Sequence, residues 1–173
     1  LFATVSFQYN AHSDIRFAEV TSDVGITYTG PSWGAAWGDF NGDGLPDLWV
    51  PNHHSGPSLY LNFVDSFIDV APDIVPLSGQ DEHGAAWADF DNDGDQDLLI
   101  ANLNDSPRLL RNEGGNRNHW LTLSLRGPKG KSDAIGARVQ VQTGDLIQIR
   151  DLIPVTGYLS QSDPRPHFAL GGM

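Results

Sequence analysis

Short apolar segments alternate with clusters of Gly, Pro, Asn and Asp over the first two thirds of the chain. In the clearest unit the apolar segments are residues 33–40, 48–51, 58–62 and 67–70. Segments of this length, with turn-forming residues in every gap, are typical of antiparallel strands joined by tight turns. The pattern predicts a four-stranded meander, which is the unit of a β-propeller blade.

The pattern changes after residue 118. Apolar and polar positions alternate strictly over residues 119–125 and 137–142, and less strictly over residues 146–152. A period of two predicts strands with one buried face. Residues 111–118, which include two consecutive glycines, have the composition of a linker, so we place a domain boundary there.

The propeller-like part contains an internal repeat. Residues 34–62 align with residues 84–112 without a gap and share 14 identities in 29 positions. This is a duplication, and a period near 50 residues belongs to the range of propeller blades and solenoid turns. Residues 17–26 also resemble the end of the first unit, which predicts the outer strand of a preceding blade.

We therefore expect an all-β chain with a partial β-propeller, two blades plus part of a third, and a C-terminal β-strand-rich domain. The expected boundaries are 1–30 for the outer strand of the preceding blade, 31–117 for the two repeats and 118–173 for the C-terminal domain. Two blades cannot close a ring of typically four to eight. The chain is thus expected to be a fragment or to self-associate through open sheet edges.

Each repeat carries one loop with oxygen-bearing side chains at positions 1, 3, 5 and 9 and Gly at position 6. A loop of this kind wraps a hard cation, and Ca²⁺ fits best because it accepts six to eight oxygen ligands in flexible geometry. Position 12 is Val50 or Ile100 rather than the Glu of an EF-hand, and both loops lead into strand-like segments. The side chains are Asp39, Asn41, Asp43 and Asp47 in the first loop, and Asp89, Asp91, Asp93 and Asp97 in the second.

Charge and composition limit the partners. The net charge of −12 makes nucleic acid an unsuitable ligand, because phosphate binding needs clustered Lys and Arg. The two loops, including Asp95, hold eight of the 22 acidic residues, so two bound Ca²⁺ would bring the net charge to −8. There is no cysteine and no run of about 18 apolar residues, so the sequence predicts neither a disulfide framework nor a membrane span.

Other functional interpretations of the polar residues account for fewer features of the sequence. The pair Asp89 and Asp91 could belong to a phosphatase or a sugar-nucleotide site, but neither accounts for Gly at position 6 or Asp at position 9. The histidines are scattered, without the paired spacing of a zinc motif on one helix. For Arg138 and Arg165 we expect structural ion pairs with Asp133 or Asp163.

The two loops resemble FG-GAP/VCBS-type repeats, in which an Asp-x-Asp/Asn-x-Asp-Gly-x-x-Asp loop binds calcium. The tail resembles the ASPIC/UnbV domain that follows such repeats in bacterial secreted proteins and in cartilage acidic protein. The resemblance to the ASPIC/UnbV domain rests on three motifs that occur in the expected order: NHWL at 118–121, DAIGARV at 133–139 and GYLSQSDPR at 157–165. The chain ends at Met173, before the final strands expected of that domain, so we expect the domain to be truncated.

The resemblance implies two Ca²⁺ sites on the loop residues given above. At position 7 the backbone carbonyls of Leu45 and Asp95 are the natural fifth ligands, and the Asp95 side chain adds charge without direct coordination. Because protein oxygens would fill the coordination sphere, the metal is expected to be structural rather than catalytic. The second loop is expected to bind more tightly because it has more carboxylates.

We therefore expect a calcium-stabilised binding or adhesion module with no catalysis of its own. The expected location is extracellular or periplasmic, although residues 1–10 lack the features of a signal peptide; the chain begins without Met, and upstream sequence is expected. The expected partner is a protein or a carbohydrate. The alternatives are an enzyme or biosynthetic accessory protein with chemistry on the propeller face, and a purely structural spacer.

Overall fold

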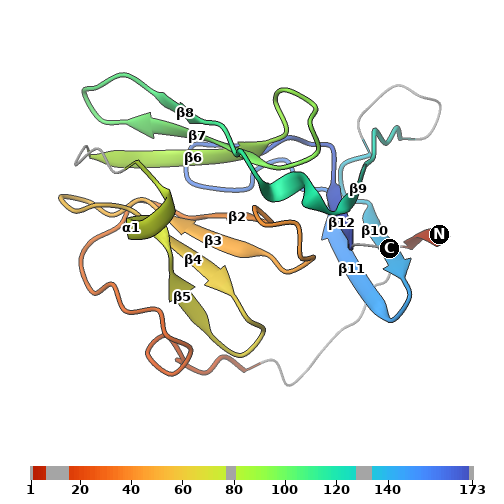
Figure 1. Cartoon of the computed structure of the whole chain (residues 1–173), viewed down its shortest axis with the longest axis horizontal. Helices are drawn as coiled ribbons and strands as arrows, with labels where there is room; N and C mark the ends of the chain where they lie inside the picture. Colours follow the sequence, from red (N-terminus) through yellow and green to blue (C-terminus); the bar gives the residue numbers. More distant parts are fainter. Residues whose placement is uncertain (1, 7–15, 77–80, 128–133, 172–173) are drawn as a thin grey trace.

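The computed structural model describes residues 2–6, 16–76, 81–127 and 134–171, and nearly all of its regular elements are antiparallel strands (Figure 1). The all-β expectation is confirmed. The strands are β1 (Phe2–Ser6), β2 (Ala36–Gly38), β3 (Asp47–Val50), β4 (Ser58–Asn62), β5 (Phe67–Asp69), β6 (Glu82–Ala88), β7 (Asp97–Asn102), β8 (Arg108–Leu110), β9 (His119–Thr122), β10 (Arg138–Thr143), β11 (Leu146–Asp151) and β12 (His167–Gly171). Two short helices complete the list, α1 (Ala71–Ile74) and the 3₁₀ turn η1 (Gly115–Arg117).

The first repeat forms the predicted four-stranded meander. Its strand order is β2-β3-β4-β5, with every neighbouring pair antiparallel. The second repeat forms the sheet β6-β7-β8 in the same arrangement, and the described residues after β8 lead into η1 rather than into a fourth strand. The two sheets lie one above the other in Figure 1, as adjacent blades do.

Apolar side chains from both blades form one core between them. Trp49 of β3 and Ile100 of β7 are completely buried, and Trp87 of β6 is 3% exposed. The Trp87 indole N–H donates to the Ala36 carbonyl at 3.2 Å, so a buried polar atom also joins β6 to β2. Ala71 of α1 belongs to the same core. The period-two pattern of each strand therefore points one face toward the neighbouring blade.

The equivalent tryptophans of the two repeats have different environments. In the sequence Trp37 alternates with Ala35 and Trp87 with Ala85, a pattern that predicts packing of both tryptophans between blades. Trp87 packs in this way, but Trp37 is 53% exposed and contacts only the ring of Phe67 among the described aromatic residues. The first blade covers Trp87, whereas Trp37 lines an open cleft between the first blade and the C-terminal domain. For Trp37 the prediction is wrong.

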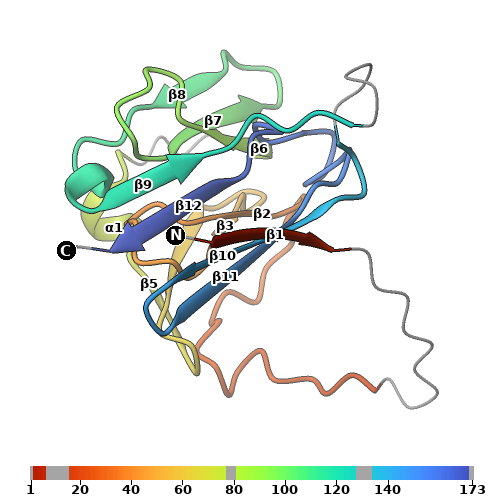
Figure 2. The same cartoon turned by 90° about the vertical axis from the view of Figure 1, so that its right-hand side faces the viewer.

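The C-terminal domain consists of two small sheets, β1-β10-β11 and β9-β12, which lie beside each other in Figure 2. Val139 and Val141 of β10 and Phe168 of β12 are buried at its centre, next to Leu152. Leu121 and Leu123 pack against this group from the β9 side. The strict alternation in the sequence thus corresponds to strands that bury one face in a core of their own.

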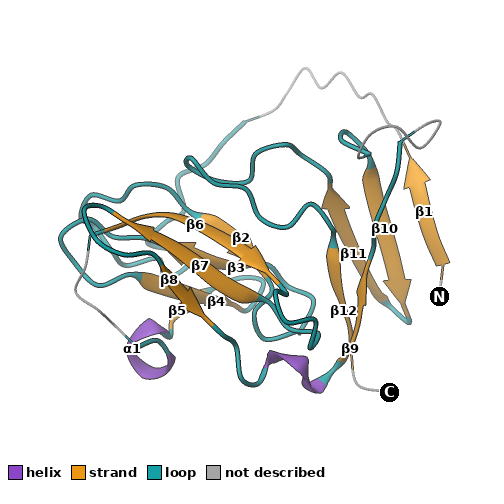
Figure 3. Cartoon of the chain, turned by 90° about the horizontal axis from the view of Figure 1, so that it is seen from above, coloured by secondary structure: helices purple, strands orange, loops and turns teal. Residues whose placement is uncertain are grey.

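The N-terminal segment differs from the expectation for residues 1–30. Its one described strand, β1, pairs antiparallel with β10, from Phe2 opposite Gln142 to Ser6 opposite Arg138, and lies at the edge of the C-terminal domain (Figure 3). Residues 16–30 contain turns and no strand. They meet the first blade through a backbone bond from the Phe67 N–H to the Val24 carbonyl and through Tyr28, whose N–H donates to the Tyr60 hydroxyl at 3.2 Å. The local resemblance to a blade edge therefore does not produce a blade strand.

Candidate metal centre

The two acidic loops occupy equivalent places in the two blades, each between the first and second strand. Within each loop the aspartates at positions 1 and 9 are buried: Asp39 is 4% exposed, Asp47 0%, Asp89 7% and Asp97 2%. The residues at positions 3 and 5 are more open to solvent. Buried carboxylates are expensive unless they are paired, hydrogen-bonded or bound to a cation.

The carboxylate at position 1 holds the turn in both loops. Asp39 accepts the N–H groups of Asp43 at 3.1 Å and of Gly44 at 2.9 Å. Asp89 accepts those of Asp93 at 3.1 Å and of Gly94 at 3.2 Å. The chain can turn so tightly because position 6 has positive φ, +92° at Gly44 and +103° at Gly94, which only glycine adopts without strain.

The carboxylate at position 9 ties the loop to the sheet. Asp47 accepts from the Phe40 N–H at 3.2 Å and from the Asn62 N–H, at the end of β4, at 2.9 Å. In the second loop Asp97 accepts from Phe90 at 3.1 Å and from Asn112 at 2.8 Å. The same four-bond frame therefore forms twice, and each carboxylate oxygen still has a lone pair for a cation.

In the second loop three carboxylates converge. One oxygen from each of Asp89, Asp91 and Asp97 lies within 4.8 Å of the others, so this group could hold a metal ion. Asp93 points its carboxylate back to the Asp95 N–H at 3.2 Å, and Asp43 binds the Leu45 N–H in the same way at 2.8 Å. Asn41 replaces Asp91 in the first loop and donates to the Asp43 carboxylate at 2.8 Å.

The side chain of Asp95 interacts with Asp93 of its own loop and with the linker that follows β8. It is 2% exposed and accepts from the N–H of Gly115, in η1, at 3.0 Å. That position 7 contributes its carbonyl to a metal ion stays a prediction. The Asp95 carboxylate fastens the linker between the two domains to the second loop.

Burial raises the pKa of several loop carboxyl groups above the usual value for Asp. The pKa of Asp39 is raised to about 6, and those of Asp47 and Asp95 to about 7. Burial raises the pKa of Asp97 as well. Backbone N–H donors lower these pKa values by less than burial raises them, and neighbouring carboxylates add to the rise for Asp39 and Asp47. A divalent cation bound by Asp39 and Asp47 would take the place of the protons that these two groups hold near neutral pH.

These shifts predict how the stability of the metal-free protein depends on pH. In the unfolded chain the Asp pKa is about 3.9, so folded Asp39 and Asp47 bind more protons than the unfolded state between about pH 4 and 7. In a buffer that contains a metal chelator, the free energy of unfolding should therefore fall as pH rises from 5 to 8. Urea unfolding at several pH values measures this, and a steady rise over the same range would contradict the assignment. With saturating Ca²⁺ the decline should disappear.

The two loops contact each other. The Asp39 N–H donates to the Gln96 side-chain oxygen of the second loop at 2.9 Å. The Asn112 amide donates to the Phe40 carbonyl of the first loop at 2.7 Å. A cation that orders one loop would therefore also stabilise the end of its neighbour.

The C-terminal domain packs on the tips of both loops. A Cβ atom on Gly94 would lie 1.7 Å from the Trp120 indole nitrogen, and one on Gly44 would lie 3.1 Å from Leu146 of β11. The Asn118 amide also donates to the Gly42 carbonyl at 2.8 Å. The glycine at position 6 thus serves the turn and makes room for the other domain, a second role that the sequence did not reveal.

The third tail motif lies along the edge of the second blade. The Asp163 N–H donates to the Trp87 carbonyl at 2.9 Å, and the Trp87 N–H donates to the Ser162 hydroxyl at 3.2 Å. Arg165 pairs with Asp163 at 2.5 Å, as expected. Arg138 pairs instead with Asp151 across the β10–β11 hairpin, at 2.7 Å, while Asp133 lies outside the described residues.

Comparisons with protein-family models match both parts of the chain. A family model described as an FG-GAP-like repeat matches residues 39–100, which span both loops. A second, described as ASPIC and UnbV, matches residues 127–173. The chain combines an FG-GAP-like repeat region with an ASPIC/UnbV domain. A search of curated proteins found no match.

These domains indicate a β-propeller module of the extracellular, adhesion-like type. FG-GAP-like repeats generally serve as non-catalytic binding modules that mediate protein interactions, are usually extracellular or periplasmic, and often bind calcium. The longest helix among the described residues has four residues, far too few to cross a bilayer.

Proposed function

We propose that the chain is a calcium-stabilised binding module that acts outside the cytoplasm, with one Ca²⁺ in each acidic loop. The proposal rests on one observation: both loops build the same hydrogen-bonded frame around carboxylates at positions 1 and 9. The ligands would be Asp39, Asn41, Asp43, the Leu45 carbonyl and Asp47, and in the second loop Asp89, Asp91, Asp93, the Asp95 carbonyl and Asp97.

The chemistry of the frame favours calcium over smaller cations. All donors are oxygens, in a flexible arrangement that suits the longer bonds of Ca²⁺. Neither loop has a bidentate Glu at position 12, and extracellular modules can function with sites of about 10⁻⁴ to 10⁻³ M affinity because calcium is abundant there. The metal would neutralise buried carboxylates and so stabilise the blades that present a binding surface.

We propose a role in binding a protein or carbohydrate, without catalysis by this chain. A cleft of about 360 Å³ lies between the repeat region and the C-terminal domain. Polar groups in its lining are held by structural contacts: Asp163 pairs with Arg165, and the His167 ring lies 3.1 Å from the Thr122 hydroxyl. These contacts favour a structural role for the cleft residues over acid–base chemistry.

Calorimetric titration tests the two sites. Wild-type protein, stripped of metal, should bind two equivalents of Ca²⁺, and the double variant Asp89→Ala/Asp93→Ala should bind one. The first loop is intact in that variant and serves as an internal control for folding. An unchanged stoichiometry of two in the folded variant would refute the assignment of the second loop.

A further inference from the structure

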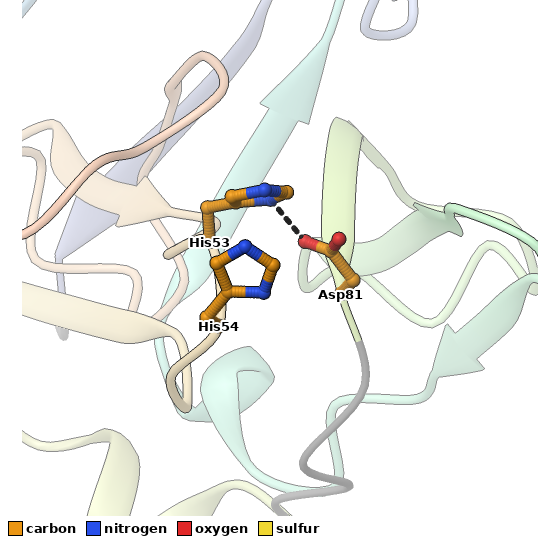
Figure 4. A group of neighbouring side chains, drawn as sticks. All are labelled: His53, His54 and Asp81. Carbon is orange, nitrogen blue, oxygen red and sulfur yellow. Dashed lines mark ion pairs between the residues drawn. The ribbon is translucent and has the colours of Figure 1, made fainter.

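A second group of metal-ligating side chains lies at the junction of the two blades, apart from the acidic loops (Figure 4). His53 and His54 form the turn after β3, and Asp81 directly precedes β6. One ligand atom from each of the three lies within 4.8 Å of the other two. In the sequence these residues are almost thirty positions apart, so no motif on one element could reveal them.

The polar atoms of this group lie at ion-pair distance from one another. His53 Nδ1 lies 2.5 Å from Asp81 Oδ1, and His83 Nε2 lies 3.7 Å from the same oxygen. All three atoms are inaccessible to solvent, and none has a hydrogen-bond partner among the described residues. These contacts are ion pairs only when the imidazoles are protonated, and a divalent cation held between neutral imidazole and carboxylate would satisfy the same buried atoms.

The backbone holds the two histidines of the turn in place. The His53 N–H donates to the Pro31 carbonyl at 2.8 Å, and the His53 carbonyl accepts from the Tyr28 hydroxyl at 3.3 Å. His54 has a φ of +61°, which places it in the left-handed region. The ring centroids of His53 and His54 are 3.7 Å apart. Their side chains are therefore presented together rather than spread along a strand.

The opposite side of the group is shaped by an irregularity in β6. The pairing of β6 with β7 shifts register between Glu82 and Ala85, where His83 lies. Such bulges redirect side chains and are common beside functional sites. The Trp33 ring contacts His83 and His53. It stacks on the His83 ring with centroids 5.4 Å apart and meets the His53 ring edge-on with centroids 5.6 Å apart.

The repeat alignment shows that this donor set is not needed to build a blade. The positions of His53, His54 and His83 correspond, 50 residues away, to Leu103, Asn104 and Trp33. Asn104 has a φ of +58°, so the left-handed turn belongs to both repeats and requires no histidine. The imidazoles are specific to the junction between the two blades.

We propose that His53, His54 and Asp81 bind one divalent transition-metal ion of the zinc class. Two imidazoles and a carboxylate suit Zn²⁺ and its neighbours, whereas Ca²⁺ prefers oxygen ligands only. Three protein ligands leave a fourth position for water or another ligand, and the exposed His54 gives the ion a path from solvent. His83 is a positioning residue that orients Asp81. This site is independent of the calcium proposal.

Cobalt titration of the full chain, without an affinity tag and in saturating Ca²⁺, tests the site. Co²⁺ should bind with one equivalent and give visible absorption, and Zn²⁺ should displace it. The variant His53→Leu/His54→Asn takes its residues from the second repeat and should fold, but it should bind Co²⁺ more than about tenfold more weakly. Asp81→Asn, which replaces only the carboxylate by an amide, should weaken Co²⁺ binding to the same extent.

Control measurements separate this site from the loops and from general histidine binding. His119→Gln, in the exposed part of β9, should keep wild-type Co²⁺ affinity. The Ca²⁺ stoichiometry of His53→Leu/His54→Asn should equal that of wild type. Wild-type protein that shows no Co²⁺ absorption up to millimolar metal, or a folded Asp81→Asn variant that binds as tightly as wild type, would overturn the proposal.

Discussion

Saturating Ca²⁺ should raise the melting temperature of the chain by about 10 to 20 °C relative to the protein in chelator. A ligand that binds only the folded state contributes about 2.7 kcal/mol at a concentration 100 times its Kd. Two such sites contribute about twice this amount. For a domain of this size each kcal/mol shifts the midpoint by about 2 to 4 °C. Differential scanning calorimetry in EDTA and in millimolar Ca²⁺ measures the shift.

Two controls make this measurement specific. Asp89→Ala/Asp93→Ala should retain about half of the shift, because only the first loop still binds. Mg²⁺ at the same concentration should give a much smaller shift, since it demands a tighter octahedral shell. An identical, cooperative melt with and without Ca²⁺ would mean that the loops are acidic turns and would remove the basis of the proposed function.

Trp87→Ala should destabilise the protein by about 3 to 5 kcal/mol, the usual cost of removing a buried aromatic side chain. Trp87 is 3% exposed, packs between the blades and donates to the Ala36 carbonyl. A Cβ atom on Gly38 would lie 2.6 Å from its ring, which shows how closely β2 and β6 approach. The lost side chain would leave a cavity that two rigid sheets cannot close. Urea unfolding in saturating Ca²⁺ measures the difference.

The repeat provides a matched control for this variant. Trp37→Ala removes the same side chain from the same position of the first blade, where 53% of it is exposed. The expected cost is about 1 kcal/mol or less, as for other surface changes. Equal losses of stability in the two variants would contradict the arrangement of the blades, because it is the covering blade that distinguishes the two positions.

The strands with clear turn residues at both ends were predictable from sequence. The predicted segments 48–51, 58–62 and 67–70 correspond to strands at 47–50, 58–62 and 67–69. The turn-forming residues Gly, Pro, Asn and Asp at the ends of these segments determine such strand boundaries. Spacing alone also placed the residues at positions 1 and 9 in one short loop, whereas their binding of a metal ion stays a prediction.

Features that depend on distant parts of the chain were not predictable. Trp37 and Trp87 have the same local pattern, and only the placement of a neighbouring sheet separates their environments. The pairing of β1 with β10 joins residues as far apart in the sequence as Phe2 and Gln142, which are 140 positions apart. The group around Asp81 was not predicted either, because its members come from distant parts of the chain. The repeat alignment does mark His53 and His83 as departures from the repeated pattern.

The packing of the C-terminal domain on the tips of the acidic loops has a thermodynamic consequence. If the loops bind Ca²⁺ as proposed, cation binding and domain docking share residues, since Gly94 lies against Trp120 and Gly42 accepts from Asn118. Coupling between two binding events is reciprocal. Any ligand that pulls the C-terminal domain away from the loops would lower their calcium affinity by the same factor by which calcium strengthens docking. The ambient calcium concentration would then set how readily the two domains separate.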